Sequence, residues 1–321
     1  MALRACVVSP NGQRIALEHT REASPPSLKI QDLRSPGKLA ETVDQKAEAF
    51  QVAFFPQPPP ADLPDTVSFQ YPQPIEFPPI TLQEIQEAVK IAKAGKAPGE
   101  DGIPNCLWHK LIEVPVILRV LGQLFNSCVR AGHKPTPFQR SITVVLRKQG
   151  KSDYHLAKSC RPVALLNTLG KFLEAVIARR ISYAVETEDL LPKTHLGGRR
   201  GICTDHAIHS MIDRIKTAWG KGKPVVSLLM LDVSGVYNNV SHDRLLHNLR
   251  KRRLGQLAPW VKAFLSIRST RIRMPEGISN QIPTPTGIPP RVADFADSLI
   301  SSTTQISLGT VERHNQQRLG G

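Results

Sequence analysis

The stretch best suited to chemistry is 225–240, VVSLLMLDVSGVYNNV, in which an apolar run of strand-forming residues ends in one carboxylate, Asp232. A small-residue turn at Ser234 and Gly235 follows, and then an aromatic residue, Tyr237. A buried strand that carries an acidic residue at its carboxyl end is a common way to place a metal ligand. The alternative is a solvated aspartate that begins a turn.

Further motifs occur in order around this stretch. They are KAPGEDGIPN at 96–105, RPVALLNTLGKFLE at 161–174, LLPKTHLGGRRGICTDHAI at 190–208 and TGIP at 286–289. Together with the aspartate strand they resemble the reverse transcriptase of non-LTR (LINE-type) retrotransposons, and the likeness to fungal elements is close. The resemblance covers about residues 63–289 and stops after TGIP, so we expect a copy truncated at that point.

The composition is typical of a soluble globular protein with a polyanionic partner. Of 321 residues, 40% are hydrophobic and 21% are charged. Lys and Arg number 42 against 27 Asp and Glu, and the net charge of +15 favours nucleic acid as a partner, the alternative being a basic protein without such a role. Five cysteines without a C-x-x-C pair indicate reduced thiols. No segment reads as a membrane span or signal peptide, so we expect the nucleus or cytoplasm, no secretion and no membrane partner.

Three regions differ in composition. Residues 1–80 are rich in proline and are expected to be a largely irregular linker, with one helix around 35–55 that Ser35 would cap. Residues 81–289 hold the expected partial reverse transcriptase domain, and 290–321 are expected to be a divergent, disordered tail. The resemblance implies an α+β fold, with right-hand polymerase fingers and a partial palm, and an irregular order of helices and strands without a βαβ repeat fits it.

Periodicity predicts the elements of the central region. A capping box at 81–84 begins one helix, and further helices are expected around 118–129, 165–184, 204–216, 242–253 and 259–267. Strands are expected at 141–148, 225–232 and 270–274.

Polymerisation joins a 3′ hydroxyl to an α-phosphorus, and two divalent metals about 3.5–4 Å apart stabilise the attacking and leaving oxygens. Metals held so close together need at least two bridging carboxylates. The resemblance implies that Asp232 binds Mg²⁺, helped by the Val233 carbonyl, and that an aromatic-x-Asp-Asp hairpin supplies the other carboxylates. That hairpin is not recognisable, because the nearest string, at 295–298, has Ser298 in place of the second aspartate. We therefore expect this chain to be catalytically inactive.

The resemblance also implies a site for a deoxynucleoside triphosphate. Tyr237 stands five residues after Asp232, at the family's sugar-gate position, where an aromatic ring would clash with a 2′ hydroxyl. A core aromatic is the alternative. Gly287 lies in TGIP, a loop that packs on the incoming nucleotide and template in the family.

Basic residues of the expected fingers match those that hold the triphosphate in the family. They are Lys148, Lys151 and Arg161, of which Arg offers a planar fork to phosphate oxygens and Lys a point charge. Two departures stand beside them: Gln149 replaces the proline of the usual Lys-Pro-Gly, and Cys160 replaces the usual aromatic residue. A solvated charge run is the alternative for these cations.

Other basic loops resemble contacts to the template. Glycines beside Lys96 and beside Arg199 and Arg200 allow a close backbone approach, and the cations would meet phosphates. The cluster Arg250, Lys251, Arg252 and Arg253 would either touch the template–primer backbone or complement the helix dipole. Cys203, His206 and His209 could each bind a metal and would lie on one face of a helix. Three ligands on one helix make a poor tetrahedral site, so no zinc is expected there.

The leading interpretation is a fragment of an RNA-directed DNA polymerase whose partners are an RNA template, a DNA primer and deoxynucleoside triphosphates. One alternative is a non-catalytic, basic nucleic-acid-binding remnant. The other is an active reverse transcriptase whose C-terminal exon has been mis-called.

Overall fold

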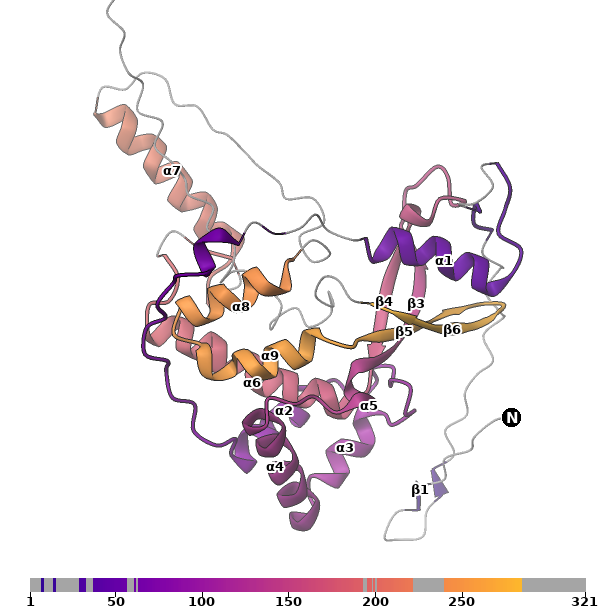
Figure 1. Cartoon of the computed structure of the whole chain (residues 1–321), viewed down its shortest axis with the longest axis horizontal. Helices are drawn as coiled ribbons and strands as arrows, with labels where there is room; N and C mark the ends of the chain where they lie inside the picture. The colour runs from indigo at the N-terminus through magenta and orange to yellow at the C-terminus, as the bar shows by residue number, and fades with distance from the viewer. Residues whose placement is uncertain are drawn as a thin grey trace, which may run out of the picture.

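The structure is a computed structural model that describes residues 7–8, 14–15, 29–32, 37–56, 61, 63–192, 195–197, 199, 201–221 and 240–284. Figure 1 shows a body of packed helices beside a twisted sheet, with one helix lying over the sheet and another projecting from the body. A separate two-stranded ladder near the N-terminus pairs β1 (Val7–Val8) with β2 (Arg14–Ile15).

The helices are α1 (Val43–Phe54), α2 (Leu82–Ile91), α3 (Asn105–Leu111), α4 (Pro115–Arg130), α5 (Thr136–Gln139), α6 (Thr168–Thr187), α7 (Thr204–Gly220), α8 (His242–Lys251) and α9 (Ala258–Leu265). Short 3₁₀ turns form at η1 (Pro64–Thr66), η2 (Ala157–Ser159) and η3 (Gly255–Leu257). The longer strands are β3 (Arg140–Arg147), β4 (Cys160–Leu166), β5 (Ser269–Met274) and β6 (Gly277–Pro283).

The four longer strands form one mixed sheet in the order β4-β3-β5-β6. β3 pairs antiparallel with β4 and parallel with β5, and β5 pairs antiparallel with β6. The register of the last pair shifts between Arg271 and Arg273, which marks a bulge. The central pair, β3 and β5, therefore joins two hairpins that are more than a hundred residues apart in the chain.

The main core lies among the helices. Apolar side chains of α2, α4, α6, α8 and α9 bury one another, and those with less than 2% of their surface exposed include Phe125, Leu173, Ile177, Trp260 and Phe264. The capping box expected at Thr81 is present, with the Thr81 side chain accepting from the Glu84 N–H and the Glu84 side chain accepting from the Thr81 N–H. This confirms the predicted start of α2.

Within the four-stranded sheet, the sequence prediction missed two strands. RPVALL was assigned partly to a helix starting at 165, whereas Cys160–Leu166 is β4 and the helix begins at Thr168, after Asn167. β6 was not predicted at all. Both strands pair with a neighbour, and this pairing overrides the weak local signal of their sequences. The expected strand at 225–232 lies outside the described residues.

Helix α1 packs on the sheet, although it belongs to the region expected to be largely irregular. It begins at Val43 behind a Thr42 capping box and not near Ser35. Its Phe50 and Phe54 pack in a second core with Ile272 of β5. The Lys46 Nζ also lies 2.8 Å from a Glu276 carboxylate oxygen, between β5 and β6. The sheet therefore has one face covered by a helix.

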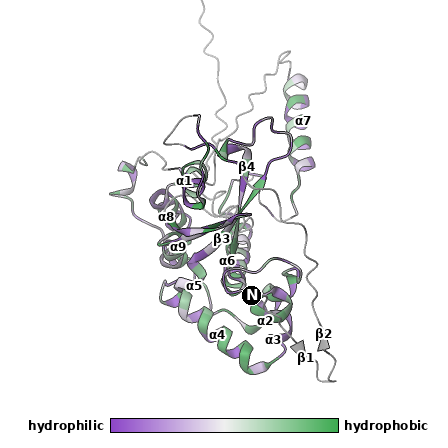
Figure 2. Ribbon diagram, turned by 90° about the vertical axis from the view of Figure 1, so that its right-hand side faces the viewer, coloured by the Kyte–Doolittle hydropathy of each residue, from purple (hydrophilic) through white to green (hydrophobic). Residues whose placement is uncertain are grey.

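α7 has no buried residue among those described, and Figure 2 shows both hydrophobic and hydrophilic residues along its length.

Within the described ranges, no single helix is long and apolar enough to cross a membrane. Of the described helices, α3 and α4 are long and apolar enough only when the two are counted as one segment, and a bend of 111° separates them. Leu118 and Phe125 of α4 lie in the helical core.

Candidate nucleic-acid interface

The β3–β4 hairpin brings together the three predicted finger cations. Lys148 follows the end of β3, Lys151 lies in the connecting loop, and Arg161 is on β4. The Lys148 side chain is half-buried and donates to the Lys158 carbonyl at 2.7 Å, whereas Lys151 and Arg161 are exposed. The two exposed cations are available to phosphate, and the half-buried one helps to close the loop.

The loop between these strands is ordered by its own side chains. The Tyr154 hydroxyl donates to the Lys148 carbonyl at 2.7 Å, and the Arg147 guanidinium lies 5.4 Å from the centre of the Tyr154 ring. Gly150 has a φ of +75°, a conformation that residues with a β-carbon rarely adopt. The glycine is thus required by the turn, although the proline that usually precedes it is absent.

The KAPG loop is fixed to the start of α6. The Asn167 side chain accepts from the Asp101 N–H at 3.2 Å and donates to the Pro137 carbonyl at 3.0 Å. Next to it, the Thr168 hydroxyl donates to the Ile103 carbonyl at 3.1 Å. Lys96 stands exposed at the outer end of this loop. Sequence reasoning missed Asn167, because it placed this residue inside a helix starting at 165, whereas Asn167 precedes the helix that begins at Thr168.

Arg199 has a partner within the chain. Its guanidinium donates to both oxygens of Glu186, at the end of α6, at 3.0 and 2.6 Å. The hydrogen bond raises the pKa of Arg199 and lowers that of Glu186. A template contact by Arg199 stays a prediction, and it would have to compete with this bidentate pair. Arg200 lies outside the described residues.

The basic cluster at the end of α8 lies against the strap, by which we mean residues 63–81. Arg250 lies 5.8 Å from the centre of the Tyr71 ring, and Lys251 lies 5.5 Å from that of Phe69. Arg252 is half-buried, and burial lowers its pKa.

Arg253, the last residue of that cluster, has a φ of +64° and lies 2.8 Å from a Glu188 carboxylate oxygen. It also donates to the Gln73 carbonyl of the strap at 3.2 Å. Helix-dipole complementation and phosphate binding both stay predictions for the cluster, which in addition holds the strap.

Further contacts fasten the strap along α8. The Arg244 guanidinium makes two 2.7 Å hydrogen bonds to the Asp65 carboxylate. The Tyr71 hydroxyl lies 3.0 Å from His247 Nδ1. Burial lowers the pKa of His247, and Asp65 partly opposes this. These contacts combine charge pairing with aromatic packing, so the strap is an integral part of the helical body.

A buried ion pair was not anticipated. Lys134 Nζ lies 2.6 Å from Glu174 Oε1, and each side chain is only 2% exposed. Arg268 is also buried, and burial lowers its pKa to about 10 although Glu174 opposes this. The three residues come from the α4–α5 connection, from α6 and from the segment before β5. They link the helical body to the sheet.

Several predicted residues cannot be placed. Asp232, Val233, Tyr237 and Gly287 lie outside the described residues. Within the described ranges there is no group of three or more His, Cys, Asp or Glu that could hold a metal ion. The metal-binding role of Asp232 therefore stays a prediction from sequence.

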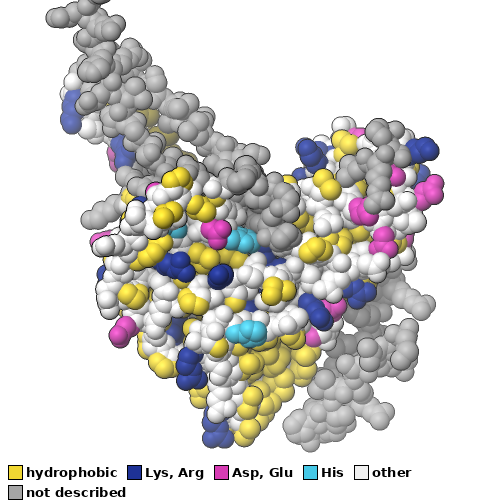
Figure 3. Space-filling view, viewed as in Figure 1, with side chains coloured by type: hydrophobic (Ala, Val, Ile, Leu, Met, Phe, Trp, Pro, Cys, Tyr) yellow, Lys and Arg dark blue, Asp and Glu magenta, His cyan; other side chains and the backbone are white. Residues whose placement is uncertain are grey.

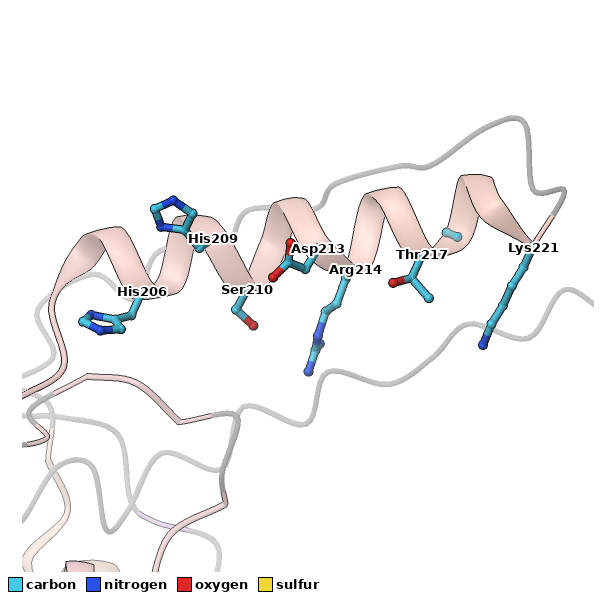
Figure 4. Close-up of a pocket in the computed structure, with 8 residues that line it drawn as sticks. His206, His209, Ser210, Asp213, Arg214, Thr217 and Lys221 are labelled. Carbon is cyan, nitrogen blue, oxygen red and sulfur yellow. The ribbon is translucent and has the colours of Figure 1, made fainter.

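A pocket of about 680 Å³ runs along α7, lined by polar residues such as His206, Asp213 and Lys221. Figure 4 shows His206 and His209 projecting from different sides of the helix. Cys203 Sγ lies 3.0 Å from His206 Nδ1, and His209 Nδ1 lies 2.8 Å from the Asp205 carbonyl. These contacts order the start of α7. On the face seen in Figure 3, Lys and Arg side chains are spread over the body and the sheet.

Comparison with known proteins gives a consistent result. The family model "Reverse transcriptase (RNA-dependent DNA polymerase)" matches residues 146–290. The RNA-directed DNA polymerase from mobile element jockey of Drosophila funebris is 28% identical over 261 residues, which cover 78% of this chain and 28% of that protein.

Two further relatives agree. The probable RNA-directed DNA polymerase from transposon X-element of Drosophila melanogaster is 27% identical over 80% of this chain and 26% of its own length. A Pol polyprotein from type-1 retrotransposable element R2 of Popillia japonica is 25% identical over 62% of this chain and 26% of its own length. The chain thus spans about a quarter of the length of each of these three relatives.

Proposed function

We propose that this chain, which belongs to the reverse transcriptases of non-LTR retrotransposons, forms the fingers and part of the palm of an RNA-directed DNA polymerase. It binds an RNA template paired with a DNA primer, and it does not extend that primer by itself. The likeness to fungal elements, the truncation after TGIP and a place in the nucleus or cytoplasm stay predictions from sequence.

One observation carries the binding part of this proposal. The β3–β4 hairpin presents Lys151 to solvent from its connecting loop and Arg161 from β4, and both residues lie within the segment that matches the family model. Exposed cations on a rigid scaffold bind phosphates without first breaking internal ion pairs. The net charge of +15 supports contact with a polyanion at the same surface.

The proposal that the chain does not extend a primer by itself rests on its carboxylates. Reverse transcriptases use divalent metal ions, and Asp232 is the residue predicted to hold Mg²⁺ in this chain. The printed sequence contains no Asp-Asp pair, so no second carboxylate motif is identified for a two-metal clamp. Positioning and charge stabilisation supply most of the catalysis in phosphoryl transfer, and a single carboxylate supplies too little of either.

Binding is tested by titrating the 321-residue chain against a fluorescent RNA–DNA duplex with an RNA overhang at rising salt. We expect the affinity to fall steeply between about 50 and 200 mM salt, because each phosphate contact releases counterions. The double variant Lys151→Gln/Arg161→Gln should bind more weakly and with a shallower salt slope. An affinity that does not change with salt would contradict the proposal.

A further inference from the structure

The two faces of the four-stranded sheet differ in chemistry. Residues directly opposite one another on paired strands point to the same face. Arg161 is opposite Leu146, and Arg273 is opposite Val144, two residues earlier on the same strand. Arg161 and Arg273 therefore share one face, together with Arg271, which is opposite Ile142. We refer to this as the arginine face.

The other face is closed. Its residues on β5 are Thr270, Ile272 and Met274, with exposed fractions of 2%, 0% and 5%. Cys160 of β4 lies in the same core, and α1 covers this side of the sheet with its phenylalanines. Helix α1 therefore covers the part of this face formed by Cys160, Ile272 and Met274.

The arginine face opens progressively toward the end of the β3–β4 hairpin. On β3, Ile142 is buried, Val144 is half-buried and Leu146 is 49% exposed. Arg161 and Arg273 stand at the open end and are exposed, and no ion pair joins either of them to a carboxylate within the described part of the chain. Arg271, nearer the buried end, lies 3.5 Å from a Glu100 carboxylate oxygen.

The spacing of the two exposed arginines suits a chain of phosphates. They are two strands and one two-residue step apart, which places their α-carbons about 12 Å from each other. At a rise of about 3.4 Å per nucleotide, that distance spans about three to four phosphates of one strand. Leu146 and Val144 lie between them and offer apolar surface to sugars or bases. A polynucleotide strand lying between the two arginines would contact both guanidinium groups through successive phosphates, whereas a triphosphate held by Arg161 need not involve Arg273.

We propose that Arg273, together with Arg161, binds the phosphates of a nucleic-acid strand lying across the arginine face. This assigns a phosphate-binding role to Arg273, which the sequence motifs do not single out, and it rests on the proposed template–primer function. Arg271 has its charge partly satisfied by Glu100 and contributes less. A nucleoside triphosphate offers the same phosphate chemistry, so the test separates the two sources.

The experiment uses the full 321-residue chain with two probes, the RNA–DNA duplex with an RNA overhang and a fluorescent deoxynucleoside triphosphate. Arg273→Gln should weaken duplex binding several-fold and lower the magnitude of the salt slope by about 1. It should leave triphosphate binding unchanged. The matched control is Arg119→Gln, which removes the same charge from an exposed position on α4 in the helical body and should change duplex binding little.

The outcomes are distinguishable. Equal effects of Arg273→Gln and Arg119→Gln would show a general charge effect and overturn the inference. So would a loss of triphosphate binding with unchanged duplex binding. If the unmodified chain does not bind the duplex in a salt-dependent way, the proposed function itself fails. If Lys151→Gln/Arg161→Gln weakens binding while Arg273→Gln does not, only the inference fails.

Discussion

Gly99 lies so close to the backbone and side chain of Asn167 that a β-carbon on Gly99 would overlap both. The same asparagine joins the KAPG loop to the connection before β3 through its two side-chain hydrogen bonds. The glycine of this motif is thus required by contact with the start of α6. The position of Lys96, at the outer end of the loop, depends on that contact.

Gly99→Ala should therefore destabilise the fold by about 1–3 kcal/mol, because the β-carbon must push apart backbone and not merely a flexible side-chain end. The change would be measured as a shift of the urea unfolding midpoint. Gly95→Ala is the matched control, since a β-carbon at Gly95 meets nothing within 4 Å. Equal urea midpoints for the two variants would contradict the prediction, because they would show that the loop moves away from Asn167 at little cost in free energy.

The buried pair of Lys134 and Glu174 predicts a larger effect. Glu174→Gln removes the carboxylate that pairs with the buried Lys134 ammonium, and should cost about 3–5 kcal/mol of unfolding free energy. Glu113→Gln removes an exposed carboxylate from its pair with Lys110 and should cost less than about 0.5 kcal/mol. Urea unfolding of both variants compares the two pairs. Similar losses of unfolding free energy in the two variants would contradict a Lys134–Glu174 pair that is buried away from water.

Acid stability should depend on Glu84. Burial would raise its pKa, but hydrogen bonds from Arg180, the Thr81 N–H and the Thr81 hydroxyl lower it from 4.5 to about 2. A carboxyl whose pKa is lower in the folded state stabilises the fold above its unfolded pKa, and this stabilisation is lost as the pH falls through the folded value. Glu84→Gln should thus remove part of the loss of stability between pH 4.5 and about 2. An unchanged unfolding profile over that range would contradict the shift.

Local signals predicted much of the fold. The Thr81 capping box and the periodic Leu118, Leu121 and Phe125 act within one or two turns of helix, so they are visible in the sequence. β4 was missed, because RPVALL is a short apolar run whose strand character comes from pairing with β3. The parallel pairing of β3 with β5 connects Val144 to Arg273, and no local pattern indicates a contact over that sequence distance.

The candidate site was predicted only in part, for a similar reason. Arg161 is exposed, as its proposed role requires. The bidentate pairing of Arg199 with Glu186 depends on how the chain returns past the end of α6, which spacing does not show. Arg273 had a visible signal, because Ser269, Arg271 and Arg273 alternate with apolar or small residues along β5. That alternation predicts an exposed face, but the registers of β4 with β3 and of β3 with β5 are needed to place Arg161 on the same face.

The most direct test of the account is a primer-extension assay with the 321-residue chain, an RNA template, a DNA primer, all four deoxynucleotides and either Mg²⁺ or Mn²⁺. The account predicts salt-sensitive binding of the template–primer by the same preparation and no extension of the primer. Asp232→Ala serves as the control and should change neither result. Extension that disappears in Asp232→Ala would contradict the account, since it would require a second carboxylate, for which Asp294 and Asp297 are the first candidates.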